Sequence, residues 1–173
     1  MKTKMPVYFI SHGGGPWPWL QGPYREAYKQ LESSLQKIPG ELPEKPKAIL
    51  MISGHWEEKN FSIMNHPQPP MLYDYGGFPE HTYRIKYSAP NSPELVSRIQ
   101  SLLNSVGIHS DLDPNRGFDH GTFTPLAVSY PNADIPVVQL SMRADYDPEI
   151  HLKIGQALAP LRDEGILIIG SGL

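Results

Sequence analysis

The sequence predicts an α/β protein in which helices cover both faces of a mostly parallel sheet. Short apolar runs alternate with amphipathic segments along the chain, an order typical of parallel sheets. Most of the apolar runs show no polar alternation, which indicates strands buried on both faces. The length of 173 residues suits one domain, and no internal repeat or change of composition divides the chain. We therefore expect residues 1–173 to form a single domain.

Short runs of apolar or β-branched residues mark the expected strands. The first two end at glycines, Gly13 and Gly54, and each of these glycines lies beside a histidine. The stretch at 83–87 alternates in polarity, which favours an edge strand. The strands expected in order are 6–11, 47–54, 61–64, 83–87, 108–112, 136–141 and 166–169.

Helices are expected where apolar residues recur at spacings of three and four. The clearest is 92–106, where Ser92 can cap the helix, Pro93 suits its first turn and Gly107 ends it. A helix over 23–38 is expected to break at Pro39 and the residues that follow. The other expected helices are 122–130 and 148–164.

Composition excludes several classes of function. The chain has 15 Lys and Arg against 18 Asp and Glu and no basic run, so a nucleic-acid partner is not expected. It has no cysteine, which excludes disulfides, thiolate metal sites and a cysteine nucleophile. No apolar stretch has the length of a membrane helix, and residues 1–6 lack the apolar core of a signal peptide. We expect a cytoplasmic protein with no membrane partner.

Two histidines follow the two most apolar early strands. His12 comes directly after the first strand, and His55 follows the second. Ligands of open α/β sheets bind beyond the carboxyl ends of the strands, so both side chains enter one crevice if the two strands are neighbours. Imidazole is the commonest ligand of transition metals, and a chain without cysteine must build such a site from His, Asp and Glu. The alternative is a pair of solvated loop histidines.

A third histidine stands before a short predicted helix. His120 lies between Asp119 and Gly121, and it can act as a general acid or base when a neighbouring group orients its ring. The alternative is that His120 only packs beside a helix cap.

An aromatic loop segment offers a wall for a planar substrate. Residues 73–79 combine aromatic rings and glycines in a stretch without regular structure. The side chains expected in this wall, from this segment and from the loop after the first strand, are Trp17, Trp19, Tyr73, Tyr75 and Phe78.

Four motifs together resemble the class III extradiol ring-cleavage dioxygenases, and within them the DOPA 4,5-dioxygenase group. The resemblance extends over essentially the whole chain, with the motifs in the same order and context. The motifs are Ser11-His12-Gly13, Ser53-Gly54-His55-Trp56, Asp74-Tyr75-Gly76-Gly77-Phe78-Pro79 and Gly117-Phe118-Asp119-His120-Gly121. The resemblance implies a three-layer α/β/α fold and cleavage of a catechol ring by dioxygen.

The resemblance also implies a role for each motif. His12 and His55 are then metal ligands for Fe(2+) or Zn(2+), and His120 lines the substrate site and assists proton transfer. The residues expected to contact the substrate are Tyr75, Gly77, Phe78 and Asp119. The expected partners are a small aromatic diol and dioxygen.

The sequence departs from the family pattern at its carboxyl end. The family has a further histidine after the last strand seen here and another ligand later, and this chain ends at Leu173 before both. We therefore expect a truncated enzyme whose metal is weakly held, and exposed apolar surface that favours self-association. A third ligand from within the chain would contradict this expectation, and His81 and Glu57 are the first candidates.

Two other functions fit the same residues. One is a metal-dependent hydrolase that uses zinc-bound water at His12 and His55. The other is a binding or scaffold protein of the same fold without catalysis.

Overall fold

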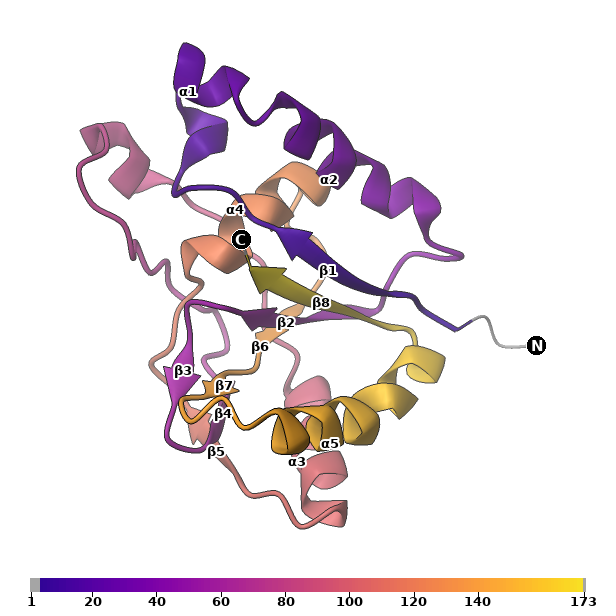
Figure 1. Ribbon diagram of the computed structural model, residues 1–173. Coiled ribbons are helices and arrows are strands. Elements are labelled where there is room, and N and C mark those ends of the chain that lie inside the picture. Colours follow the sequence, from indigo (N-terminus) through magenta and orange to yellow (C-terminus); the bar gives the residue numbers. More distant parts are fainter. Residues whose placement is uncertain (1–3, 173) are drawn as a thin grey trace.

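The computed structural model describes residues 4–172 and shows one four-stranded parallel sheet between two layers of helices (Figure 1). All three strand pairings in this sheet are parallel. The three-layer α/β/α arrangement with a parallel central sheet is therefore confirmed. The strands in spatial order are β1 (Val7–Ser11), β8 (Ile166–Gly172), β2 (Ala48–Ser53) and β6 (Val137–Gln139).

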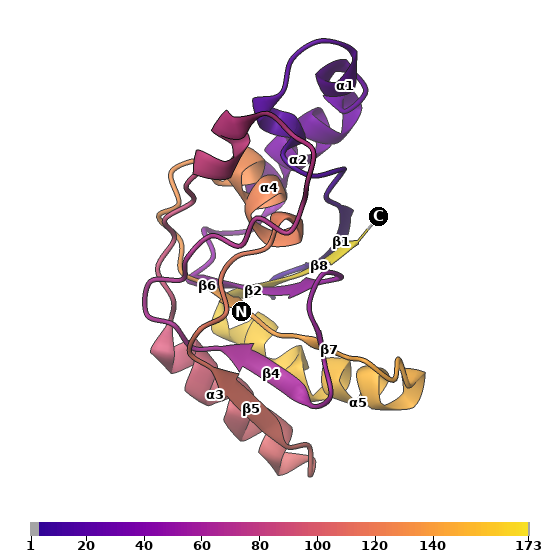
Figure 2. The same ribbon diagram turned by 90° about the vertical axis from the view of Figure 1, so that its left-hand side faces the viewer.

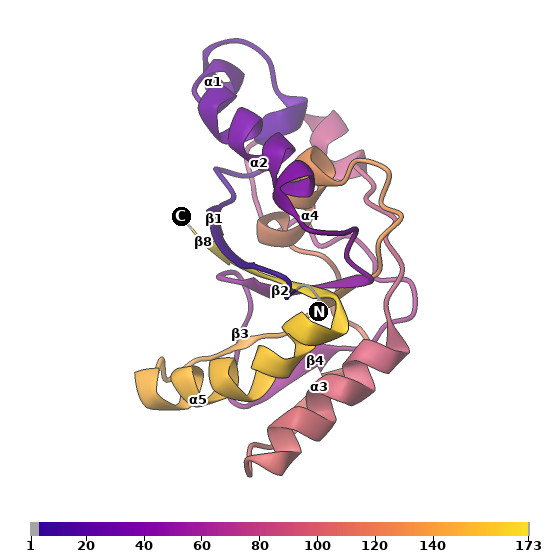
Figure 3. The ribbon, with the colours of Figure 1, turned by 90° about the vertical axis from the view of Figure 1, so that its right-hand side faces the viewer.

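The helices divide between the two faces of the sheet, as the side views show (Figures 2 and 3). One layer contains α1 (Pro23–Glu26), α2 (Lys29–Glu41) and α4 (His120–Ser129), with α2 packed on α4 and α4 on β2 and β8. The other layer contains α3 (Pro93–Ser105) and α5 (Pro148–Leu158), which pack together. Single-turn and two-turn 3-10 helices lie at Trp17–Trp19, Glu80–Arg84 and Ala159–Glu164.

Two short parallel pairs flank the central sheet. The strand β4 (Phe61–Met64) pairs with β5 (Ser110–Asp113). The strand β3 (Glu57–Glu58) pairs with β7 (Met142–Arg143), and the apolar pattern of the sequence gave no sign of this second pair. Along the chain, β3 and β4 follow β2, β7 follows β6, and β5 follows α3.

The helix α3 forms as its sequence predicts. Ser92 accepts a hydrogen bond from the backbone N–H of Leu95, and Pro93 occupies the first turn. Its apolar face is buried against the sheet layer through Leu95, Val96, Ile99, Leu102 and Leu103. Burial of a leucine or isoleucine side chain contributes about 1.5–3 kcal/mol, so this face fixes the helix to the core.

Three expected elements differ from the structure. The stretch 83–87 is no strand: a 3-10 helix ends at Arg84, and the extended residues after it join no β-ladder in the described chain. Its alternation comes instead from burial of Ile85 and Tyr87 beside exposed Lys86. The helix expected over 23–38 is two helices, and the second of them, α2, continues through Pro39 to Glu41. The helix expected over 148–164 becomes 3-10 after Leu158, where Pro160 follows.

The strand β1 forms an edge of the central sheet with apolar surface in contact with solvent. Val7 is 52% exposed and Phe9 is 82% exposed, and Leu152 on α5 is 68% exposed. None of the helices in residues 4–172 has the length and apolar character needed to cross a membrane.

Candidate metal centre

The strand β8 lies between the two strands that end before His12 and His55. One shared crevice was expected if β1 and β2 were neighbours, but the two strands do not pair with each other, and each of them pairs with β8. In this register Ser171 stands opposite Ile10 on β1 and Ser53 on β2. Ser171 is therefore placed between the ends of the two histidine-bearing strands.

His12 and His55 meet across the end of β8. Strands are about 4.8 Å apart, so the backbones of β1 and β2 are about 9.6 Å apart, a gap that two imidazole side chains can bridge. The Nε2 atoms of His12 and His55 lie 3.0 Å apart. The two rings thus lie side by side, although the strands that carry them are not neighbours.

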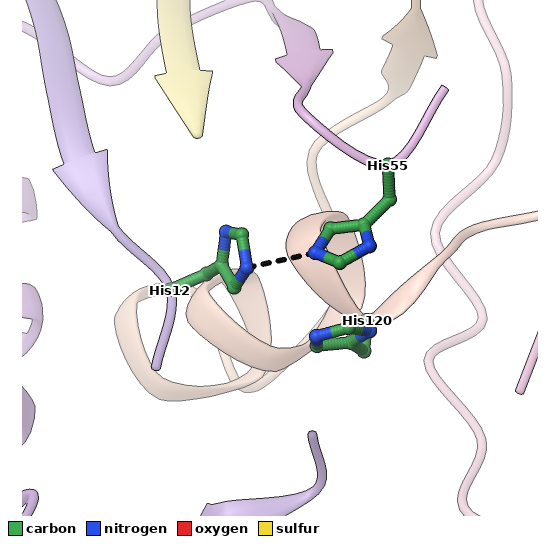
Figure 4. A group of neighbouring side chains, drawn as sticks. All are labelled: His12, His55 and His120. Atoms are coloured by element: carbon green, nitrogen blue, oxygen red, sulfur yellow. Dashed lines mark hydrogen bonds between the residues drawn. The ribbon is translucent and has the colours of Figure 1, made fainter. Parts of the chain in front are cut away.

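His120 joins this pair from the helix layer. It is the first residue of α4, and α4 packs over the carboxyl ends of β2 and β8. Figure 4 shows the three imidazole rings around one space, with His120 beside the His12–His55 pair. One nitrogen from each ring lies within 4.8 Å of the other two. Among the described residues these three form the cluster that could hold a metal ion.

A loop carboxylate, Asp74, holds His120 from behind. Its Oδ1 accepts hydrogen bonds from the backbone N–H of His120 at 2.9 Å and from ring atom Nδ1 at 2.8 Å. Its Oδ2 lies 3.3 Å from Nδ1 of His55. Burial raises the pKa of Asp74, but the two His120 hydrogen bonds and the nearby imidazoles outweigh it, so the pKa lies below its ordinary value.

The approach of two chain segments brings Asp74 to His120. Leu72 N–H donates to Phe118 O at 2.8 Å, and Phe118 N–H donates to Pro70 O at 2.8 Å. Gly117 permits this pairing, because a Cβ there would lie 2.3 Å from the carbonyl oxygen of Pro70. Two segments more than forty residues apart in sequence are thus aligned, and the aligned residues continue into Asp74 and the start of α4.

Burial keeps the two closest imidazoles uncharged. The pKa of His12 falls to about 4, chiefly through burial and then through repulsion by His120 and His55. Burial, followed by repulsion from His120, also lowers the pKa of His55. A neutral imidazole has a nitrogen lone pair, and this is the form that binds metals.

The geometry of the His12–His55 pair fits one metal ion. Zinc binds imidazole nitrogen at about 2.1 Å, so two such nitrogens around one ion are about 3.0 Å apart at a right angle and about 3.4 Å apart at the tetrahedral angle. The observed Nε2–Nε2 distance is 3.0 Å. The nitrogens of all three rings, His120 included, lie only within 4.8 Å of one another. The His12–His55 pair therefore fits a shared ion more closely than the three rings together do. Neutral imidazole is a common ligand of both Zn²⁺ and Fe²⁺.

Asp119 has a different place from the one that the sequence suggested. It is fully buried and caps α4, accepting from the backbone N–H of Thr122. The side chains of Ser53, Arg116 and Gln139 also donate to its two oxygens, at 2.7, 2.7 and 2.9 Å. Asp74 and not Asp119 therefore orients the His120 ring, and Asp119 ties β2, β6 and α4 together beneath the cluster.

Part of the expected aromatic wall stands beside His120. The Tyr75 ring centroid is 5.9 Å from that of His120, and Phe78 is 5.5 Å from Tyr75. The adjacent Gly77 is exposed and has φ of 77°, a conformation that glycine adopts without strain. Trp17, in contrast, is fully buried and donates to the carbonyl of His12 at 2.8 Å, so it supports the His12 loop and is no part of the wall.

Neither of the third ligands suggested from the sequence belongs to the cluster. His81 is exposed and its Nε2 contacts the carbonyl of Trp19, and Glu57 is exposed on β3. Sequence reasoning also missed Ser171, whose Oγ lies 2.9 Å from Nδ1 of His12. A serine at the carboxyl end of a buried strand was the available signal, but it acquires meaning only with the strand order.

Comparisons with known proteins match nearly the whole chain. A family model described as the catalytic LigB subunit of aromatic ring-opening dioxygenase matches residues 6–173. A 4,5-DOPA dioxygenase extradiol from Beta vulgaris is 50% identical over 96% of this chain and 60% of its own length. Another protein of that name from Escherichia coli is 36% identical over 98% of this chain and 59% of its own length.

A solved structure shows the same fold. The crystal structure of an uncharacterized protein from Escherichia coli K12 superimposes with a TM-score of 0.74 at 36% identity, covering 98% of this chain and 60% of that one. The chain thus spans about three fifths of the length of these relatives. On the match over residues 6–173, the chain belongs to the family of catalytic LigB subunits of aromatic ring-opening dioxygenases.

Proposed function

We propose that this chain forms the metal-binding part of an extradiol dioxygenase that opens the ring of a catechol with dioxygen. The observation that carries the proposal is the pair of imidazole nitrogens 3.0 Å apart at the carboxyl end of the sheet, with a third imidazole beside them. The relatives named 4,5-DOPA dioxygenase extradiol support a DOPA-like catechol as the substrate class.

In this proposal His12 and His55 hold the metal through Nε2. A bound Fe²⁺ ion would orient the catechol and dioxygen and pass electrons between them, whereas Zn²⁺ would supply charge and orientation alone. The reaction balances without another reactant, because both atoms of dioxygen enter the ring-opened product. One atom becomes part of the new aldehyde group and the other part of the new carboxyl group. The exposed side of His55, at 33% of its side chain, leaves an approach for both molecules.

His120 is the proposed acid and base. Its Nδ1 is held by Asp74, so Nε2 is the atom that accepts a proton from a catechol hydroxyl. The carboxylate of Asp74 then stabilises the imidazolium that forms, and the same Nε2 returns the proton later in the reaction. Tyr75 and Phe78 would contact the face of the substrate ring, and Gly77 leaves space beside them.

The test is turnover of a catechol panel by the Fe²⁺-loaded chain, mixed without oxygen and then exposed to air. We expect oxygen uptake and a yellow ring-opened semialdehyde, both lost in His120→Gln and kept in His109→Gln, which changes an exposed histidine. Ester or amide hydrolysis with Zn²⁺ and no oxygen uptake would favour a hydrolase. Binding of a protein partner that His12→Ala does not affect, without any turnover, would favour a scaffold.

A further inference from the structure

Hydrogen bonds behind the three imidazoles determine where each ring carries its proton. Ser171 Oγ lies 2.5 Å from the carbonyl oxygen of Gly121. Two oxygens that close need a proton between them, so the single hydroxyl proton of Ser171 is donated to Gly121. Towards His12, at 2.9 Å, Ser171 Oγ can only accept. His12 therefore carries its proton on Nδ1, and its Nε2 keeps a lone pair.

Asp74 imposes the same arrangement on the other two rings. An ionised carboxylate has no proton to donate, so every ring nitrogen that faces it must be a donor. Nδ1 of His120 lies 2.8 Å from one oxygen, and Nδ1 of His55 lies 3.3 Å from the other. His120 therefore carries its proton on Nδ1, and the carboxylate favours the same tautomer of His55. One carboxylate, 19% exposed, thus faces a proposed ligand and the proposed acid–base residue together.

We propose that Asp74 and Ser171 are positioning residues that fix all three imidazoles of the metal-bound site as Nδ1–H tautomers, so that the Nε2 lone pairs of His12 and His55 are left for one shared cation and that of His120 for a substrate proton. The proposal rests on the proposed metal centre and adds the reason for its affinity. Two lone pairs 3.0 Å apart, on His12 and His55, repel each other, and a cation between them converts the repulsion into two bonds.

The alternative tautomer of His55, with its proton on Nε2, replaces this repulsion by another. A proton on Nε2 would allow a hydrogen bond to His12, but it would leave an Nδ1 lone pair facing the Asp74 carboxylate. Without a cation, a neutral His55 therefore has either the hydrogen bond to His12 or a donor towards Asp74, and a cation at Nε2 favours the second arrangement. Groups that orient metal-bound histidines in this way typically change metal affinity 10–100-fold when they are removed.

The variant Asp74→Asn separates this role from packing. The amide has nearly the shape of the carboxylate, but one of its two ends donates, so it cannot accept from both rings. His55 or His120 must then move its proton to Nε2. Ser171→Ala removes the acceptor behind His12 in the same way. The matched control is Asp111→Asn, since Asp111 also accepts from a histidine, His109 at 2.9 Å, on the exposed surface.

The experiment has two readouts on ¹⁵N-histidine-labelled protein. Long-range ¹H–¹⁵N correlation spectra assign the tautomer of each ring in the metal-free and the zinc-loaded chain, and calorimetry with Zn²⁺ alone measures affinity. We expect Nδ1–H in metal-free His12 and His120 and in all three zinc-loaded rings. Affinity should fall roughly 10–100-fold in Asp74→Asn and Ser171→Ala and stay unchanged in Asp111→Asn.

The internal reference is His151, whose Nδ1 contacts the carbonyl of Asp147 at 2.6 Å and which should keep its signals in every variant. Nε2–H tautomers in wild-type His12 or His120 would overturn the proposal. An unchanged tautomer and affinity in a folded Asp74→Asn chain would also overturn it, even if the dioxygenase reaction occurs. Conversely, the predicted tautomers without zinc binding would support this inference and count against the proposed metal centre.

Discussion

Two carboxylate–imidazole pairs in this protein have nearly the same geometry and very different surroundings. Asp74 lies 2.8 Å from His120, and their side chains are 19% and 8% exposed. Asp111 lies 2.9 Å from His109, and their side chains are 49% and 76% exposed. In the exposed pair, water competes for every hydrogen bond, and such pairs contribute little.

Distance and residue type alone therefore do not identify a functional site in this protein. The Asp74 pair belongs to a set of three imidazoles that share one partly enclosed space, whereas His109 has no second imidazole within a metal-sized cluster of the described residues. Enclosure lowers the local dielectric and makes each hydrogen bond more selective. What distinguishes the first region is the convergence of several groups, and each experiment below changes one of them.

The largest effect is expected from removal of a proposed ligand. His12→Ala deletes one of the two nitrogens that lie 3.0 Å apart, so Zn²⁺ affinity should fall on the order of 100-fold or more. Calorimetry measures the affinity, and circular dichroism checks that the variant is folded. His109→Ala should bind as the wild type does. A folded His12→Ala chain with wild-type affinity would place the metal elsewhere.

The next effect concerns the buried carboxylate beneath the cluster. Asp119→Ala leaves Arg116, 14% exposed, without its ion partner and also removes the α4 cap. Breaking a buried pair from one side typically costs about 3–5 kcal/mol. Urea unfolding should show a loss of that size, and Asp111→Ala should show no measurable change. A loss below about 1 kcal/mol would mean that water replaces the carboxylate at this position.

The sequence predicted the three histidines of the candidate site, but it did not predict the strand order that brings them together. His12, His55 and His120 were predictable because each follows an apolar strand or precedes a helix, and those local patterns were correct. The position of β8 between β1 and β2 was not predictable, since periodicity within a strand carries no information on which strands pair.

The residues behind the histidines escaped sequence reasoning for the same physical reason. Asp74 meets His120 across 46 positions, and Ser171 meets His12 across 159. Such contacts depend on strand order and on the approach of loop 70–74 to residues 117–120. The alternation at 83–87 misled for the opposite reason, because it reflects which side chains are buried and not which backbone groups pair.

A smaller effect on stability is expected when a methyl group is added at Gly121, where α4 contacts Ser53 and His55. In Gly121→Ala the new Cβ would lie 2.4 Å from Ser53 Oγ and 3.0 Å from His55 Cδ2, so the chain must shift. Such overpacking costs about 1–3 kcal/mol. Gly155→Ala on α5 meets nothing within 4 Å and should stabilise the helix by about 0.5–1 kcal/mol. Equal unfolding midpoints for the two variants would contradict the crowding inferred around His55.

The smallest effect is expected at the exposed Asp111–His109 pair, in a double-mutant cycle that measures the coupling between the two side chains. Asp111→Asn, His109→Gln and their combination should leave the urea midpoint unchanged within error, so that the pair shows no measurable coupling. Asn60 also donates a hydrogen bond to Asp111, at 3.1 Å. Asp111→Asn can keep this bond, because the new amide still has an oxygen that accepts from Asn60. The same cycle with Asp74→Asn and His120→Gln should show coupling, because these side chains are shielded from water and His120 also donates its backbone N–H to Asp74. Coupling of similar size in both cycles would mean that the contact itself, and not its surroundings, determines the strength of a carboxylate–imidazole pair in this protein.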